Sequence, residues 1–452
     1  MEVIKSLANK DTNFYWQWGI LVFLIFLMSL VGGLSLWYSQ KYSLYTETTN
    51  SIKLLREIRN HEVGSIVPRD LPAVCNNLTR AIPWKSIGPA KYALVNWRPL
   101  TVRLVGYLGG PDAKEPLMNG VFDVPSGIAY ALKLGARSFF FDIDYLEATP
   151  CNPLLLYRDK SGYKRSLNSG SILEATTALS TGAFASNVDP VLIIIYLRRI
   201  PPGKNQQSTF FLNLAQSLKP LAQHHLGLTD QGNFHNCGHE SALFLAPITD
   251  YANKFIVCVN YDTFQPETSS STIPTDNLHF WNNARIYQDP LAGGSILGKV
   301  TPSAPSSGVA SIQVGSLDLI LSQDPSTYTT RTTSAKFTIS IAEPEYVYTN
   351  TKMERLLNTL GVQCVPIDVL GLGINPNHAA ANSTISADKK QSPSNVVDLS
   401  NDVTTSQTDP LAYWYYAGWS FKNIEEPTAG GTPGGTLVTT STDGSPSLTM
   451  GT

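Results

Sequence analysis

Two carboxylates and one guanidinium are the first candidates for chemistry in this sequence. Asp142 and Asp144 lie in the apolar run SFFFDIDYL, and as residues i and i+2 of a strand they share one face. Arg158 follows in the next apolar run, PLLLYRD. A guanidinium beside paired carboxylates forms charge-assisted and often bidentate hydrogen bonds, so these residues predict ion pairs that neutralise one another. No G-x-S-x-G or H-E-x-x-H motif adds a nucleophile or a zinc-binding pair.

The elements that position these residues read as alternating strands and helices from about residue 96 to 375, which predicts βα units and a parallel sheet. PVLIIIYLRR is typical of a strand buried on both faces, and Ser171 with Glu174 predicts a capping box at the start of a helix. The region is close in length to the ~250 residues of a (β/α)8 barrel. We therefore expect an α/β fold with a TIM-type barrel at 96–375 that carries a Ser/Thr/Pro-rich insertion at 263–334. An open doubly wound sheet is the alternative.

Residues 15–38 contain no charged side chain and predict one transmembrane helix. As a helix they span about 36 Å, against a hydrocarbon core of roughly 30 Å. Aromatic residues stand at both ends, as they do at the two interfaces of a membrane: Trp16, Trp18, Trp37 and Tyr38.

The span separates a short tail at 1–14 from a stalk or packing arm at 39–95. A cleaved signal peptide fits poorly, because the apolar core is too long and no A-x-A-like site follows it. We expect a retained, single-pass anchor. Lys and Arg flank both ends with a slight excess after the span, which leaves the orientation open and weakly favours a cytosolic body.

Beyond the barrel region, residues 376–452 are rich in Asn, Ser, Thr, Asp and Gly and predict an extended tail. An aromatic cluster at 412–421 interrupts it, and Trp414 and Trp419 predict either an exposed docking patch or a plug for one end of the barrel. The segment from about Lys422 onward cannot bury enough apolar surface to fold alone, so we expect it to be ordered only through contact with other chains.

Composition restricts the partners. Charged residues make up 15% of the chain, against about 25% in soluble domains, and the formal net charge is −2. Such a chain has no basic footprint for a phosphate backbone, so we expect no nucleic-acid partner. The five cysteines are widely spaced and include no C-x-x-C pair, which argues against a zinc knuckle, a redox motif or a disulfide framework.

The sequence at about 101–263 resembles the catalytic X region of phosphatidylinositol-specific phospholipase C, most closely that of the eukaryotic type. This X region is a TIM barrel. The matching segments, in order, are GARSFFFDIDYL, PLLLYRD, LNSGSILEATTAL, AFASNVDPVLIIIYL and KFIVCVNYDT. The resemblance implies two catalytic histidines, a general base and a general acid, often with calcium to neutralise the phosphate.

Most of the residues that this chemistry needs are replaced. The first histidine would fall at 107–111, where the sequence is YLGGP, and the second would fall at Arg158. The calcium carboxylates on the second strand are retained as Asp142 and Asp144, whereas the carboxylate expected on PVLIIIYL is Tyr196. We therefore expect a vestigial pocket of Asp142, Asp144, Arg158 and Tyr196, with no catalytic residue, cofactor or metal. Calcium at the two aspartates is the alternative.

These features predict a membrane-anchored pseudoenzyme that acts as a structural or interaction protein. Its partners would be a lipid bilayer and other chains of a large assembly. An anchor, a barrel without histidines and a Ser/Thr-rich tail resemble virion components of large DNA viruses, such as minor capsid proteins that connect an internal membrane to the capsid. One rival is an active membrane-bound phosphoinositide-type phosphodiesterase that uses Asp142, Asp144 and Arg158. Another is a receptor domain for lipid headgroups or glycans.

Overall fold

The computed structural model forms two compact units, residues 1–54 and 55–452. It describes residues 2–64, 73–77, 92–108, 120–159, 161–227, 229–230, 233–234, 240–261, 275–294, 300–303, 312–343, 346, 348–368, 414 and 418–422. The expected tail at 376–452 therefore lies outside the described residues, except for Trp414 and the segment 418–422.

Helix α1 (Glu2–Gly64) contains the predicted span and continues beyond it in both directions. Its stretch Trp18–Ser43 is long and apolar enough to cross a membrane, a test of length and composition that a signal sequence also passes. The predicted interface side chains are exposed, and the ammonium of Lys41 lies 4.4 Å above the Trp37 ring. The helical backbone agrees with the span predicted at 15–38.

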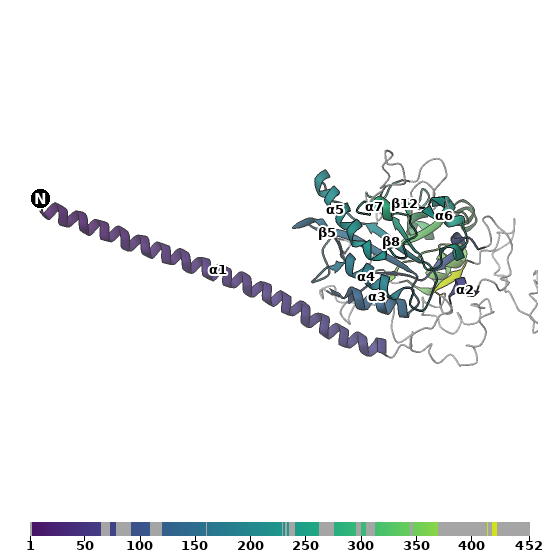
Figure 1. Cartoon of the computed structure of the whole chain (residues 1–452), viewed down its shortest axis with the longest axis horizontal. Helices are drawn as coiled ribbons and strands as arrows, with labels where there is room; N and C mark the ends of the chain where they lie inside the picture. The colour runs from purple at the N-terminus through teal and green to yellow at the C-terminus, as the bar shows by residue number, and fades with distance from the viewer. Residues whose placement is uncertain are drawn as a thin grey trace, which may run out of the picture. The chain divides into compact units, whose positions relative to one another are not determined.

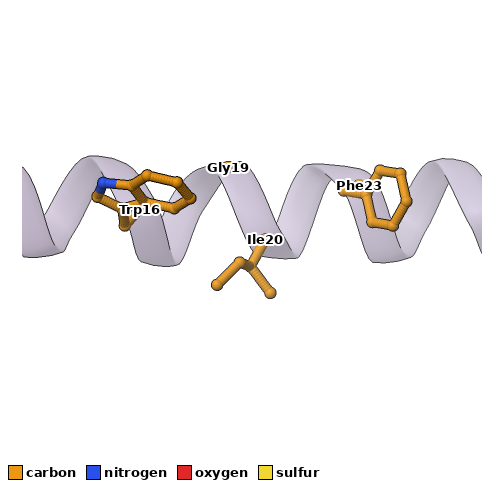
Figure 2. A pocket seen from close by; sticks show the side chains of 4 residues that line it. All are labelled: Trp16, Gly19, Ile20 and Phe23. Carbon is orange, nitrogen blue, oxygen red and sulfur yellow. The ribbon is translucent and has the colours of Figure 1, made fainter.

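A shallow hollow lies on α1 where Gly19 has no side chain. Figure 2 shows Trp16, Gly19, Ile20 and Phe23 along this stretch of the helix. Their spacing of i, i+3, i+4 and i+7 places them on one face. The hollow is formed by apolar side chains of a single helix, so it would face acyl chains if α1 spans a bilayer.

We expect the full-length chain to stay in the membrane pellet after alkaline carbonate extraction. The reason is the exposed apolar surface of Trp18–Ser43. Changing Phe26→Lys together with Leu30→Lys should release the chain, because each charge near the centre of a span costs about 2.5–3.5 kcal/mol of insertion free energy. Wild-type chain in the supernatant, or a mature N-terminus beyond Tyr38, would contradict a retained anchor.

The second unit is built on a closed barrel of parallel strands. Their order around the sheet follows the chain: β2 (Thr101–Arg103), β5 (Ser138–Leu146), β8 (Val191–Leu197), β11 (Phe255–Val259), β12 (Ala284–Gln288), β13 (Ile312–Ser316), β14 (Phe337–Ile341) and β15 (Ile367–Asp368). The ends meet, because β15 pairs with β2 and Ile339 of β14 forms a parallel bridge with Cys364 just before β15. The Ser340 amide donates to the Cys364 carbonyl oxygen at 2.9 Å. This order without reversal confirms the barrel and excludes an open doubly wound sheet.

Helices cover the outside of the strands. α3 (Val124–Lys133), α4 (Ile172–Gly182) and α5 (Lys204–Ser217) are the longest of them (Figure 1). The Ser171 hydroxyl accepts a hydrogen bond from the Glu174 amide at 3.3 Å, as the predicted capping box requires. The shorter helical segments are α2 (Val74–Asn77), η1 (Leu94–Asn96), η2 (Lys219–Leu221), α6 (Glu240–Leu245), η3 (Ile248–Tyr251), α7 (Leu278–Trp281), α8 (Leu317–Leu321), α9 (Pro325–Tyr328), η6 (Thr329–Thr333), α10 (Asn350–Glu354) and η7 (Arg355–Thr359).

The remaining strands pair antiparallel outside the barrel. They are β1 (Trp97–Pro99) with β16 (Trp419–Phe421), β3 (Tyr107–Leu108) with β4 (Val121–Phe122), β6 (Thr149–Leu155) with β5 and with β7 (Gly170–Ser171), and β9 (Thr229–Asp230) with β10 (Asn233–Phe234). The run PLLLYRD therefore continues a hairpin strand that returns along β5, and it does not form the next parallel strand.

The segment expected as an insertion, 263–334, supplies two strands of the barrel. β12 pairs in parallel with β11, and β13 pairs in parallel with β12 and β14. Their apolar runs, ARIYQ and IQVGS, are short and lie in Ser/Thr/Pro-rich text. Pairing with buried neighbours on both sides compensates for this weak local signal.

Trp414 and Trp419 are buried at the end of the barrel where the strands begin, with exposed fractions of 0% and 1%. The indole N–H of Trp414 donates to the Arg98 carbonyl oxygen at 2.9 Å, and that of Trp419 donates to the Pro190 carbonyl oxygen at 3.0 Å. Pro190 directly precedes β8. Of the two predictions for this cluster, the placement matches the plug and corrects the possible docking patch at Trp414 and Trp419. Burial is favourable because both indole donors find carbonyl acceptors.

Candidate functional site at the barrel mouth

The inner face of β5 carries its polar residues to the end of the barrel where the strands finish. Phe140 belongs to the buried core, and Asp142 and Asp144 follow it at two-residue spacing on the same face. Asp142 lies opposite Tyr196 of β8, and Arg103 of β2 lies opposite Phe140. Barrel enzymes build their active sites at this end, so the mouth is the candidate site.

Asp142 is held by two arginines. Arg103 binds Asp142 in a bidentate contact, with Nε 2.6 Å from one carboxylate oxygen and Nη2 3.0 Å from the other. Arg198 adds a third hydrogen bond from its Nε at 2.6 Å. The last guanidinium nitrogen of Arg103 donates to the carbonyl oxygen of Ala342 at 2.8 Å. Each oxygen of this buried carboxylate thus accepts at least one charge-assisted hydrogen bond.

Asp144 has a second, separate pair of arginines. Arg158 Nε lies 2.7 Å from one carboxylate oxygen and Arg199 Nε lies 2.8 Å from the other. The amide of Tyr145 also donates to Asp144, at 2.7 Å. Arg199 extends outward to the exposed Glu147, with Nη1 2.9 Å from its carboxylate. The mouth therefore holds four arginines and three carboxylates in two clusters, one centred on Asp142 and one on Asp144.

The cluster around Asp142 keeps this buried carboxylate ionised. Burial alone would raise the pKa of Asp142, but the charges of Arg103 and Arg198 and their hydrogen bonds outweigh it and hold the pKa below its usual range. Burial lowers the pKa of Arg103, and the opposing attraction of Asp142 makes the net shift upward. Both members of this pair are therefore charged at neutral pH.

Tyr196 forms one wall of the mouth and is fully buried. Its ring centroid lies 5.2 Å from that of Phe140, and the Arg198 guanidinium lies 5.1 Å from its centroid. Its hydroxyl accepts a hydrogen bond from Thr301 at 3.4 Å. Burial raises the pKa of Tyr196, so the side chain is neutral where the resemblance would place a carboxylate.

The carboxylates of Asp142 and Asp144 do not fit a calcium site, because calcium takes six to eight oxygen ligands. Every oxygen of Asp142 and Asp144 already accepts from a guanidinium, and a divalent cation would have to displace two arginines from each. Among the residues that the structure describes, no group of three or more His, Cys, Asp or Glu side chains is arranged to hold a metal ion.

The histidines with described side chains lie where strands β11 and β12 begin, at the opposite end of the barrel. His225 forms a bridge with Phe255, the first residue of β11, and His279 lies in α7 ahead of β12. His225 accepts from the Gly227 amide and therefore donates from Nε2 to the Trp281 carbonyl oxygen at 3.0 Å. Burial lowers its pKa to about 4, so it is a neutral core residue.

The structure brings together all four residues of the predicted pocket, Asp142, Asp144, Arg158 and Tyr196. Sequence reasoning missed three arginines of these two clusters: Arg103, Arg198 and Arg199. The pair Arg198 and Arg199 was visible as the RR that ends PVLIIIYLRR, at the carboxyl end of a predicted strand. Nothing local marked Arg103, because its partner lies 39 residues away.

Comparisons with known proteins found similar solved structures at low sequence identity. No family model and no curated protein matches the sequence. A similar solved structure is PLC21 of L. pealei, at 11% identity and a TM-score of 0.44, with 74% of this chain and 38% of that chain covered. Another is a calcium-dependent phosphoinositol-specific phospholipase C from Pseudomonas sp. (11% identity, TM-score 0.35, 64% and 96% covered). A third is a Ca2+-dependent phosphatidylinositol-specific phospholipase C from Streptomyces antibioticus (14%, 0.36, 61% and 94%). The chain spans less than half the length of the L. pealei protein, and the likeness concerns the fold.

Proposed function

We propose that this protein is a non-catalytic, membrane-anchored barrel that serves as a structural or interaction component of a larger assembly. The barrel supplies a rigid body and α1 supplies the anchor. Because one fold hosts many functions, the proposal rests on the site and not on the barrel alone.

The observation that carries the proposal is the saturation of the mouth by its own arginines. A general acid or base must exchange a proton with substrate within hydrogen-bond reach. Asp142 instead accepts three hydrogen bonds from Arg103 and Arg198, and Asp144 accepts from Arg158 and Arg199. The arginines are likewise occupied by carboxylates, which weakens them as ligands for a substrate phosphate.

We expect no hydrolysis of phosphatidylinositol above blank when the full-length chain is assayed in mixed micelles with calcium. General acid and base groups contribute typically 10²–10⁴-fold each, and the described mouth offers none. A calcium-dependent phospholipase C under the same conditions is the positive control. Turnover that is lost in Asp144→Asn and kept in Glu147→Gln would establish the rival enzyme and overturn the proposal.

The finer proposal is a minor capsid protein of a large DNA virus that links an internal membrane to the capsid. Three features support it: an apolar N-terminal helix, a barrel whose mouth carboxylates are paired with arginines, and a long Ser/Thr-rich C-terminal segment. The chain should then be a stoichiometric component of gradient-purified particles and should stay with the membrane fraction when the capsid is stripped. Absence from such particles would remove the viral assignment and leave the non-catalytic role intact.

A further inference from the structure

The C-terminal strap, defined here by its described residues Trp414 and 418–422, forms a two-stranded sheet with β1 outside the barrel strands. β16 runs antiparallel to β1, with Ser420 opposite Arg98. Two further backbone hydrogen bonds extend the ladder: the Leu100 amide donates to the Gly418 carbonyl at 2.8 Å, and the Lys422 amide donates to Asn96 at 2.8 Å. The contact is therefore a strand addition to the edge of β1.

Aromatic anchors surround this short ladder. The two buried indoles, Trp414 and Trp419, donate to backbone carbonyls of the barrel, and Phe421 packs edge-to-face on Trp97 at 5.1 Å between centroids. Buried tryptophans in fitted pockets, combined with main-chain pairing, are the means by which proteins bind separate peptide strands. The barrel face would recognise the same strap equally well on another chain.

The strap also buries a lysine amino group, and the desolvation of this group opposes docking. Lys422 is 6% exposed, and its Nζ donates to the Thr333 carbonyl oxygen. Burial, and then repulsion from Arg98, holds the pKa of Lys422 well below its usual range. A docked lysine without a described carboxylate partner limits the strength of the contact, which favours a strap that can leave its site.

Chain length does not restrict the strap to its own barrel. Residues 369–413 connect β15 to Trp414, and a chain of that length can reach on the order of 150 Å when extended. Strap exchange needs no new contact surface, because the swapped and unswapped interfaces contain the same residues. Copies held on one membrane surface would have a high effective concentration for each other.

We propose that the strap is exchangeable, so that the β1 edge of one copy accepts Trp414 and residues 418–422 of a second copy and strand addition joins neighbouring chains. The proposal goes beyond the proposed function by naming the partner and the surface. It does not depend on the residues of the barrel mouth, so hydrolysis of phosphatidylinositol in the assay above would not affect it.

Two differently tagged full-length chains test the exchange, one with Arg98→Cys and the other with Ser420→Cys. Because these positions are opposite in the ladder, a disulfide between the two introduced cysteines reports a strap that lies on the other copy's β1. We expect a heterodimer band on a non-reducing gel that is absent from a wild-type pair carrying only the native cysteines. A second pair, Asn96→Cys with Lys422→Cys, repeats the test without removing the buried Arg98.

Gly418→Ala provides a strap that cannot dock. A Cβ at this position would lie 2.3 Å from the Gly135 carbonyl oxygen, which is backbone and cannot turn aside. Adding it to the Ser420→Cys chain should abolish the heterodimer. The matched control Gly203→Ala should keep it, because that Cβ meets only the end of the Gln206 side chain.

The outcome that overturns the proposal is specific. If one chain carrying both Arg98→Cys and Ser420→Cys forms its internal disulfide, but neither split pair gives more heterodimer than wild type, the strap stays on its own barrel and exchange is refuted.

Discussion

Replacing Asp142 by asparagine is expected to lower the free energy of unfolding by about 3–5 kcal/mol. The Arg103 side chain is 2% exposed and would remain buried beside a neutral partner. Breaking a buried ion pair from one side leaves an uncompensated charge, whereas exposed pairs contribute little. Urea unfolding of the full-length chain, followed by circular dichroism, measures the change.

A double replacement separates the charge from the shape of the mouth. Arg103→Met with Asp142→Leu removes the buried pair and retains similar volume, so most of the lost stability should return. Arg198 also loses Asp142 as a partner in this variant, but its guanidinium can turn to solvent because the side chain is 22% exposed. Glu147→Gln is the control for an exposed ion pair and should leave unfolding unchanged. An unaffected Asp142→Asn variant would show that the pair does not stabilise the barrel.

The ion pair of Arg103 and Asp142 also makes the free energy of unfolding depend on pH. The pKa of Asp142 is lowered in the folded state, so its contribution is complete above the unfolded-state value of about 3.9 and is lost as the pH falls through the folded-state value. The wild type should therefore lose stability steeply below about pH 4. The Arg103→Met/Asp142→Leu variant should lose less over the same range.

Gly127→Ala is expected to destabilise the barrel unit by about 1–3 kcal/mol. Helix propensity alone predicts the opposite sign, a gain of about 0.5–1 kcal/mol for alanine in a helix. In the structure a Cβ on Gly127 would lie 2.2 Å from the amide nitrogen of Gly106 and 2.3 Å from its Cα. Gly106 cannot retreat easily, because its φ is +83° and its carbonyl accepts from the Asp123 amide at 2.6 Å.

Gly182→Ala is the matched control for this close approach. Its Cβ would meet only the Leu132 Cδ1 atom at 2.9 Å, the far end of a flexible side chain. Urea unfolding of both variants should show a clear loss for Gly127→Ala and a smaller one for Gly182→Ala. Equal stability of Gly127→Ala and wild type would mean that α3 and the Gly106 turn do not pack this closely.

The sequence by itself determined the elements whose signal is local. The run VLIIIYL predicts a buried strand wherever it folds, and the Ser171 cap predicts the start of α4 from four adjacent residues. Strands and helices in alternation then restrict the sheet to parallel connections, so the α/β class followed from order, and length favoured the barrel over an open doubly wound sheet. VASIQVG was a candidate strand of the insertion, but β12 and the place of β13 in the barrel were missed, because their pairing depends on neighbours that are distant in sequence.

Only the tertiary structure decided which charges meet at the mouth and where the aromatic cluster lies. Arg103 and Arg198 are 39 and 56 residues from Asp142, and strand register alone brings them to one carboxylate. Composition showed that the segment of Trp414 and Trp419 is aromatic, but an exposed patch and a buried plug have the same residue types. Burial depends on whether acceptors such as the Arg98 and Pro190 carbonyls lie within reach of the indole donors, and such long-range geometry has no local sequence signature.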